Sequence, residues 1–214
     1  MKLDDYLTES RRARIAQVLA ARTRDLLLVL EGVHDPHNVA ACMRTAEGLG
    51  LQEVHVVAPG AYHPHHKVVQ GADKWLDIHT HRDPAELAGA LRPRGYLLYA
   101  AALVPAAAEI ASLDFTRRVA LVLGNEHDGV SREMMDACDG AFVIPMRGFT
   151  RSFNVSVAAG IALYHATRAR EAVLGPGGTL GEADREALRA AWVERSVRRG
   201  ALLREELEER DRST

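Results

Sequence analysis

Residues 26–50 have the sequence LLLVLEGVHDPHNVAACMRTAEGLG, which contains a strand, a polar loop and a helix in succession. The apolar run Leu26–Glu31 favours a strand buried on both faces. Asp35 and Pro36 follow as an N-cap and a first-turn proline, and they predict a helix that ends near Leu49. A buried strand that leads into a helix is typical of an α/β domain with a parallel sheet.

The same alternation of apolar runs and helical patterns continues along the chain. Further strands are expected at residues 53–57, 76–79, 96–101, 119–123 and 141–144. Further helices are expected at residues 83–95, 131–138 and 154–171. The last helix carries the apolar residues Val157, Ile161, Leu163 and Tyr164. The sequence therefore predicts a mostly parallel sheet with helices between its strands.

Composition divides the chain into four segments. Residues 174–181, LGPGGTLG, combine a proline with four glycines and are interpreted as a linker. The predicted segments are a basic N-terminal helix at 1–24, an α/β core at 25–173, the linker at 174–181 and a charged C-terminal helical extension at 182–214.

Basic residues are concentrated in two places, although 27 Lys and Arg against 29 Asp and Glu give a net charge of −2. Residues 10–24 hold five arginines and residues 146–170 hold four, and neither segment contains an acid. Arginine suits phosphate, so these segments indicate an anionic partner. The alternative explanation is Arg-biased codon usage. The candidate residues for binding such a partner are Arg11, Arg12, Arg14, Arg151 and Arg168.

The chain has neither a run of about 18 apolar residues nor a secretory signal pattern. Its two cysteines, Cys42 and Cys138, form no disulfide framework. We therefore expect a cytoplasmic protein without a membrane partner.

Three polar loops follow predicted strands, where ligands of open parallel sheets bind. They span residues 31–38, 123–131 and 144–156, and none contains a dinucleotide or P-loop motif. The histidines at 63–66 lack a neighbouring cysteine or carboxylate cluster, so we expect loop histidines and no metal. Spacing alone favours structural roles in these loops: an Arg44–Glu47 ion pair, Asn154 as an N-cap and Ser152 as a turn residue.

Taken together, the loops resemble the three motifs of the SpoU (TrmH) branch of the SPOUT RNA methyltransferases. The first motif of this branch is similar to HDPHNVAACMRTAEGLG, the second to LVLGNEHDGVS and the third to IPMRGFTRSFNVSVAAGIALY, and the order along the chain is the same. The resemblance implies a SPOUT-type parallel sheet with helices on both faces and a deep C-terminal trefoil knot. It also implies a homodimer that binds S-adenosylmethionine.

The resemblance also assigns residues by their place in the motifs. Its catalytic set falls on Asn38, Arg44, Glu126, Ser152 and Asn154, and its cofactor-binding segments fall around Ala101, Gly124, Ile144 and Phe153. Arg151 and Phe153 stand where relatives tend to have glutamine and leucine.

The chain is most similar to family members that methylate the 2′-hydroxyl of a D-loop guanosine in tRNA. We therefore expect ribose methylation of tRNA at guanosine 18, with S-adenosylhomocysteine as the second product and neither metal nor DNA involved. The alternatives are a methyltransferase acting on ribosomal RNA ribose and a non-catalytic RNA-binding member of the fold.

Overall fold

The computed structural model describes residues 3–58, 71–197, 200, 202 and 204. Residues 23–176 form one compact unit, called here the sheet unit. Residues 1–22 and 177–214 form a second, called the terminal unit. Among the described residues, no helix combines the length and apolar content that a membrane span requires.

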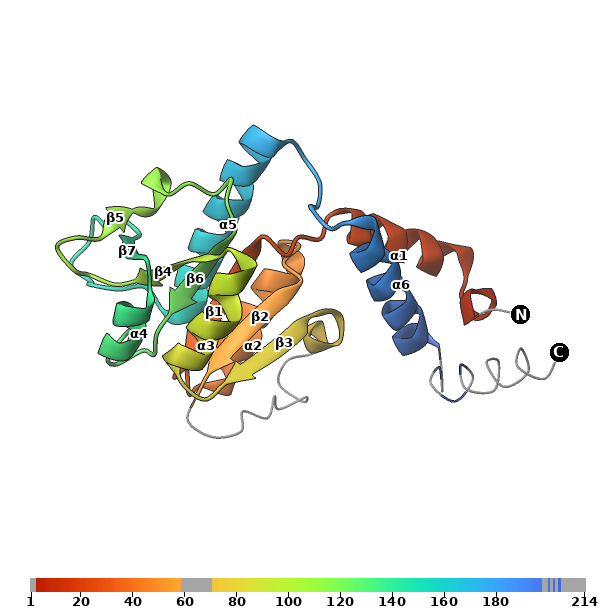
Figure 1. Ribbon diagram of the computed structural model, residues 1–214, viewed down its shortest axis with the longest axis horizontal. Coiled ribbons are helices and arrows are strands. Elements are labelled where there is room, and N and C mark those ends of the chain that lie inside the picture. Colours follow the sequence, from red (N-terminus) through yellow and green to blue (C-terminus); the bar gives the residue numbers. More distant parts are fainter. Residues whose placement is uncertain (1–2, 59–70, 198–199, 201, 203, 205–214) are drawn as a thin grey trace. The chain divides into compact units, whose positions relative to one another are not determined.

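The sheet unit is built on a parallel sheet with the strand order β3-β2-β1-β6-β4-β7-β5 (Figure 1). Its strands are β1 (Leu26–Glu31), β2 (Glu53–Val57), β3 (Asp77–His81), β4 (Leu97–Ala101), β5 (Ala108–Glu109), β6 (Val119–Leu123) and β7 (Gly140–Val143). Each neighbouring pair is parallel, so the carboxyl ends of the strands lie at one edge. β1, β2 and β6 are the most deeply buried strands. This burial explains the apolar runs of β1 and β6, whereas β2 also buries Glu53 and His55.

Helices cover both faces of this sheet (Figure 1). α2 (Pro36–Gly48) and α5 (Val155–Leu174) pack on one face with Leu28 and Leu121. α3 (Pro84–Leu91) and α4 (Arg132–Ala137) pack on the other. The short 3-10 helices are η1 (Leu3–Tyr6), η2 (Ala72–Trp75), η3 (Arg92–Arg94) and η4 (Ile110–Ser112). The predicted α/β class with a parallel sheet is confirmed.

The predicted helix starts are confirmed, because each rests on a local capping side chain. Asp35 accepts a hydrogen bond from the His37 amide, Ser131 from the Met134 amide and Asn154 from the Ser156 amide. The predicted ends were less accurate: α5 continues to Leu174, β3 begins at Asp77, and β5 was missed because two residues give no periodicity.

The apolar residues of α5 divide between the core and the surface. Leu163 is fully buried against the sheet. Val157, Ile161 and Tyr164 keep 48%, 36% and 59% of their surface exposed. They form an apolar stripe on the outer side of the helix.

The terminal unit pairs α1 (Glu9–Ala20) with α6 (Glu182–Ser196). Between them Arg22 is buried with its guanidinium 5.2 Å from the centre of the Trp192 ring. The amides of Gly178 and Thr179 donate hydrogen bonds to the carbonyls of Ala20 and Arg22. A side chain at Gly178 would lie 2.1 Å from the Arg22 carbonyl oxygen, so this contact requires glycine. Part of the segment predicted as a linker is therefore an ordered strap within the terminal unit.

Candidate active site

A cavity of about 660 Å³ opens at the carboxyl ends of β4, β6 and β7. Its walls include the four residues that sequence resemblance assigns to cofactor binding, Ala101, Gly124, Ile144 and Phe153. Three members of the predicted catalytic set, Glu126, Ser152 and Asn154, line it as well. The sheet thus brings segments far apart in the sequence to one concave surface.

A chain of hydrogen bonds connects the three motif loops beside this cavity. The Asn154 side-chain amide donates to Asn38 Oδ1 over 3.1 Å, and the Asn38 amide donates to Glu126 Oε1 over 2.5 Å. Asn154 Oδ1 also accepts hydrogen bonds from the amide and hydroxyl of Ser156. The predicted N-cap role of Asn154 is therefore confirmed. Its side-chain oxygen caps the helix, and its side-chain NH2 group binds Asn38 of the first motif.

Arg44 lies on the exposed side of α2. It and Asn38 belong to the same regular helix, so their side chains diverge by about 120°. Neither residue belongs to the described cavity wall, but Asn38 reaches two wall residues through its side chain. The Arg44–Glu47 pair stays a prediction.

Apolar side chains form much of the remaining wall. Leu103 and Val104, from the segment after β4, are 70% and 39% exposed, and Phe153 is 37% exposed. No local pattern predicts a site role for Leu103 or Val104, because a loop residue joins a cavity only through the tertiary fold. Acidic groups of Glu126 and Asp128 stand at the same cavity. This surface suits a ligand with a flat apolar part and a positive charge.

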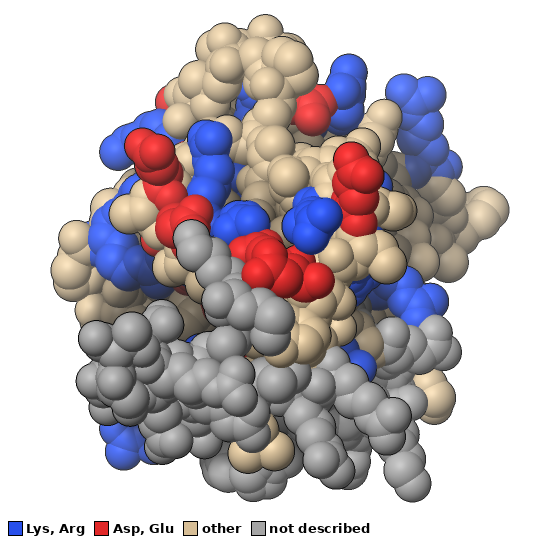
Figure 2. Space-filling model, turned by 90° about the vertical axis from the view of Figure 1, so that its right-hand side faces the viewer, with Lys and Arg blue, Asp and Glu red and all other residues tan. Residues whose placement is uncertain are grey.

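The predicted RNA-binding arginines lie in both units. Arg151 lines the cavity, and Arg168 forms an ion pair with Glu171 on α5. In the terminal unit, Arg12 donates to the carbonyls of Asp4 and Leu7. Arg14 donates to Gln17, and Arg11 donates to Ser196. The face drawn in Figure 2 carries acidic side chains among the basic ones.

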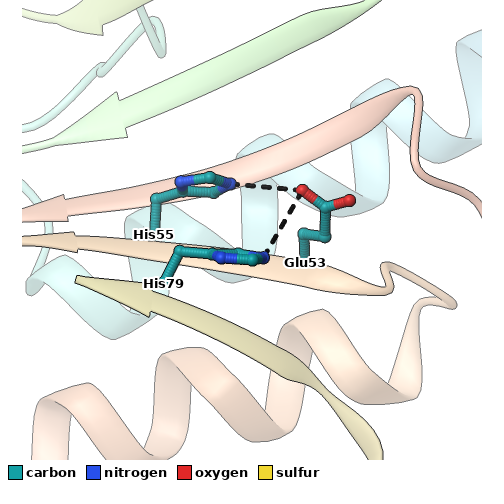
Figure 3. A group of neighbouring side chains, drawn as sticks. All are labelled: Glu53, His55 and His79. Atoms are coloured by element: carbon teal, nitrogen blue, oxygen red, sulfur yellow. Dashed lines mark hydrogen bonds and ion pairs between the residues drawn. The ribbon is translucent and has the colours of Figure 1, made fainter. Parts of the chain in front are cut away.

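A cluster of ionisable side chains lies on β2 and β3, away from the cavity. His55 and His79 direct ring nitrogens toward Glu53, at 3.4 and 3.8 Å from its Oε2 (Figure 3). Such a set could hold a metal ion, but Arg24 and Arg94 already bind the same carboxylate. A metal cation at this carboxylate would have to displace these guanidinium groups or bind despite their electrostatic repulsion. The histidines at 63–66 lie outside the described residues.

Hydrogen bonding keeps Glu53 ionised despite its burial. Burial alone would raise the pKa of Glu53, but hydrogen bonds from His55, Arg94 and Arg24 outweigh that effect and hold the pKa below its ordinary range. Burial also lowers the pKa of His79 and of His81, so these rings favour their neutral form. The register that pairs His55 with His79 assembles this cluster, and no single stretch of sequence predicts it.

Comparison with known proteins identifies the family. The model of the SpoU rRNA Methylase family matches residues 25–164. The chain therefore belongs to this family. A tRNA (guanosine(18)-2′-O)-methyltransferase of Thermus thermophilus is 42% identical over 164 residues, which cover 76% of this chain and 84% of the relative. The protein of the same name from Escherichia coli is 36% identical over 166 residues, 77% of this chain and 72% of the relative.

Solved structures agree with this assignment. The A. aeolicus TrmH/SpoU tRNA modifying enzyme superimposes with a TM-score of 0.79 at 31% identity, covering 89% of this chain and 98% of that one. The SpoU methyltransferase AviRb from Streptomyces viridochromogenes, in complex with the cofactor AdoMet, superimposes with a TM-score of 0.65 at 26% identity. That match covers 73% of this chain and 64% of AviRb.

Proposed function

We propose that this protein methylates the ribose 2′-hydroxyl of guanosine 18 in the D-loop of tRNA, using S-adenosylmethionine as methyl donor. The observation that carries the proposal is the hydrogen-bonded chain Asn154–Asn38–Glu126 beside a cavity walled by Ala101, Gly124, Ile144 and Phe153. The relatives from T. thermophilus and E. coli, both named for this reaction, support the choice of substrate.

The cavity has properties that suit the proposed donor. Its volume of about 660 Å³ falls within the usual range for small-ligand sites. Leu103, Val104 and Phe153 offer apolar surface for an adenine ring. The carboxylates of Glu126 and Asp128 favour a cationic sulfonium and ammonium group nearby.

When bound, the sulfonium compound supplies an activated methyl group that needs no covalent enzyme intermediate. Arg44 is proposed to hold the phosphate next to the target ribose and to assist removal of the hydroxyl proton. Asn38, Glu126 and Asn154 are proposed to fix the relative positions of the three loops. Holding the hydroxyl in line with the methyl group supplies the orientation that the reaction requires.

We also propose the C-terminal trefoil knot, the homodimer and the cytoplasmic location that sequence resemblance implies. The placement of β6 between β1 and β4, with α5 packed against α2, is compatible with such a knot. The exposed stripe of Val157, Ile161 and Tyr164 supports a homodimer, because association would bury it. Sedimentation at micromolar concentration tests this, and a monomer would contradict it.

Ribosomal RNA is the second candidate substrate. A relative named 23S rRNA (guanosine-2′-O-)-methyltransferase RlmB, from Xanthomonas campestris, is 38% identical over 156 residues. It matches 72% of this chain and 62% of its own length.

Methyl transfer to matched RNA substrates separates these possibilities. Purified protein and labelled S-adenosylmethionine would be incubated with tRNA, with the same tRNA carrying 2′-deoxyguanosine at position 18, and with ribosomal RNA. We expect label only in the unmodified tRNA. Label in ribosomal RNA alone would favour the second substrate. Cofactor binding without transfer to any RNA would favour a non-catalytic binding protein.

A further inference from the structure

The carboxyl end of β1 is tied directly to the loop that follows β6. Glu31, the last residue of β1, accepts a hydrogen bond from the Ser131 amide over 2.9 Å and another from the Ser131 hydroxyl over 2.6 Å. The same hydroxyl accepts from the Met134 amide and caps α4. One carboxylate therefore holds the point at which the loop ends and α4 begins.

The loop attached to this point is closed on itself. Asn125 and Gly129 exchange two backbone hydrogen bonds of 3.1 Å. Asn125 Oδ1 accepts from the amides of His127 and Asp128 over 2.9 and 2.8 Å. A side chain on Gly124 would lie 2.0 Å from the Gly129 backbone. Residues 124–131, called here the closed loop, therefore have little internal freedom, and their position depends on their attachments.

The attachments come from both sides of the first polar loop. Glu31 is the first residue of that loop and holds Ser131, while Asn38 is its last residue and binds Glu126. Between these points, residues 124–130 form part of the cavity wall. A shift at the Glu31 attachment would therefore move that wall.

We propose that Glu31 is a positioning residue that holds the closed loop in its ligand-binding shape, so that affinity for S-adenosylmethionine depends on Glu31. The inference rests on the proposed function, because it takes that compound as the ligand. Hydrogen bonds to a charged group contribute more than neutral ones. Without the carboxylate, the ligand would have to order the loop as it binds, and its affinity would fall.

The test uses Glu31→Ala, Glu31→Gln and the matched control Asp83→Ala. Asp83 caps α3 by accepting from the Glu86 amide over 2.8 Å and is not part of the cavity wall, so its loss removes a cap without touching the closed loop. Hydrogen exchange of residues 124–131 is measured in the ligand-free proteins. Calorimetry then gives the affinities for S-adenosylmethionine and S-adenosylhomocysteine.

We expect Glu31→Ala to accelerate exchange in the closed loop and to weaken both affinities about tenfold, with Glu31→Gln intermediate because its oxygen still accepts from one donor. Asp83→Ala should change neither the hydrogen exchange of the closed loop nor the two affinities. Unchanged exchange and affinity in the Glu31 variants would overturn the inference, and so would an equal loss of affinity in Asp83→Ala. In either case, binding of S-adenosylmethionine by the wild-type protein would leave the proposed function standing. A wild-type protein that binds neither compound would overturn both. If Glu31→Ala does not fold, Glu31→Gln supplies the comparison.

Discussion

The two ends of the same parallel strands carry polar residues of different kinds. At the amino ends, charged side chains pair with one another: Arg24 and Arg94 bind Glu53, and Arg170 binds Asp25 over 3.2 Å. Glu53 is nearly inaccessible, with 2% of its side chain exposed. At the carboxyl ends, a chain of two amides and one carboxylate runs along an open cavity. Glu126 and Asn154 are exposed there.

This difference separates stability from chemistry. Charges that neutralise one another in a buried network are costly to disturb singly, so such a network fixes the strands. Side chains at the cavity keep their loops in place while facing solvent and any ligand. The comparison predicts that variants at the amino ends change unfolding, whereas variants at the carboxyl ends change binding or turnover.

The largest effect is expected at Arg44. Arg44→Ala should lower methyl transfer about 10²–10⁴-fold, the loss typical of a missing acid–base group, with little change in cofactor affinity. Arg44→Lys should restore little, because an ammonium group cannot make a two-pronged phosphate contact. Single-turnover methylation and thermal unfolding would be measured together. The control Arg82→Ala removes an exposed arginine that pairs with Glu86 on α3. Near-normal turnover in folded Arg44→Ala would remove Arg44 from the mechanism.

At the opposite end of the strands, Glu53→Gln should destabilise the fold by about 3 kcal/mol, because it removes the charge of the buried carboxylate that pairs with the partly exposed guanidinium groups of Arg24 and Arg94. Urea unfolding measures this loss, and cofactor affinity of the folded variant should stay near that of the wild type. Glu86→Gln, which alters an exposed pair with Arg82, is the control. A similar small effect in both variants would show that the Glu53 network contributes little.

The same network predicts an acid dependence with a definite sign. Because the pKa of Glu53 in the folded protein is below its ordinary value, its contribution to stability is complete above about pH 4.3, the ordinary glutamate value. That contribution declines as pH falls toward the folded-state pKa. The stability difference between wild type and Glu53→Gln should therefore shrink below about pH 4. A difference independent of pH down to acid unfolding would contradict this.

A smaller effect is expected in the terminal unit. Replacing Arg11, Arg12 and Arg14 by alanine should weaken tRNA binding and reduce the slope of log affinity against log salt by at most about three units. Cofactor affinity should not change. Truncation is a poorer test, because removing α6 deprives Arg22 of its Trp192 contact. Unchanged tRNA affinity would mean that these arginines serve only the terminal unit.

No effect is expected from chelation. Methyl transfer should be the same before and after EDTA treatment, because the proposed reaction uses no metal and Glu53 is engaged by two arginines. Activity that is lost and then restored only by a metal ion would contradict the prediction.

Sequence predicted the elements better than their assembly. β1 and the start of α2 were predictable because the Leu26–Glu31 run and the Asp35–Pro36 pair act locally. Strand order and the Glu53 cluster depend on register between distant segments, so local patterns do not specify them. The candidate site residues came from motif resemblance, whereas spacing alone favoured structural roles. Glu31 had one visible signal, an acid that ends an apolar strand, but its partner Ser131 lies 100 residues away.

The pairing of α1 with α6 has a consequence for the order in which the protein folds during synthesis. The hydrogen bond between Arg11 and Ser196 joins residues 185 positions apart. At about 5–20 residues per second, a ribosome needs roughly 10–40 s to make that length of chain. During that interval β1 to β7 are made in turn, and α1 stays without its partner helix. Because α6 is made after β1 to β7, the terminal unit is completed last, and the strands can pair before α1 meets its partner helix.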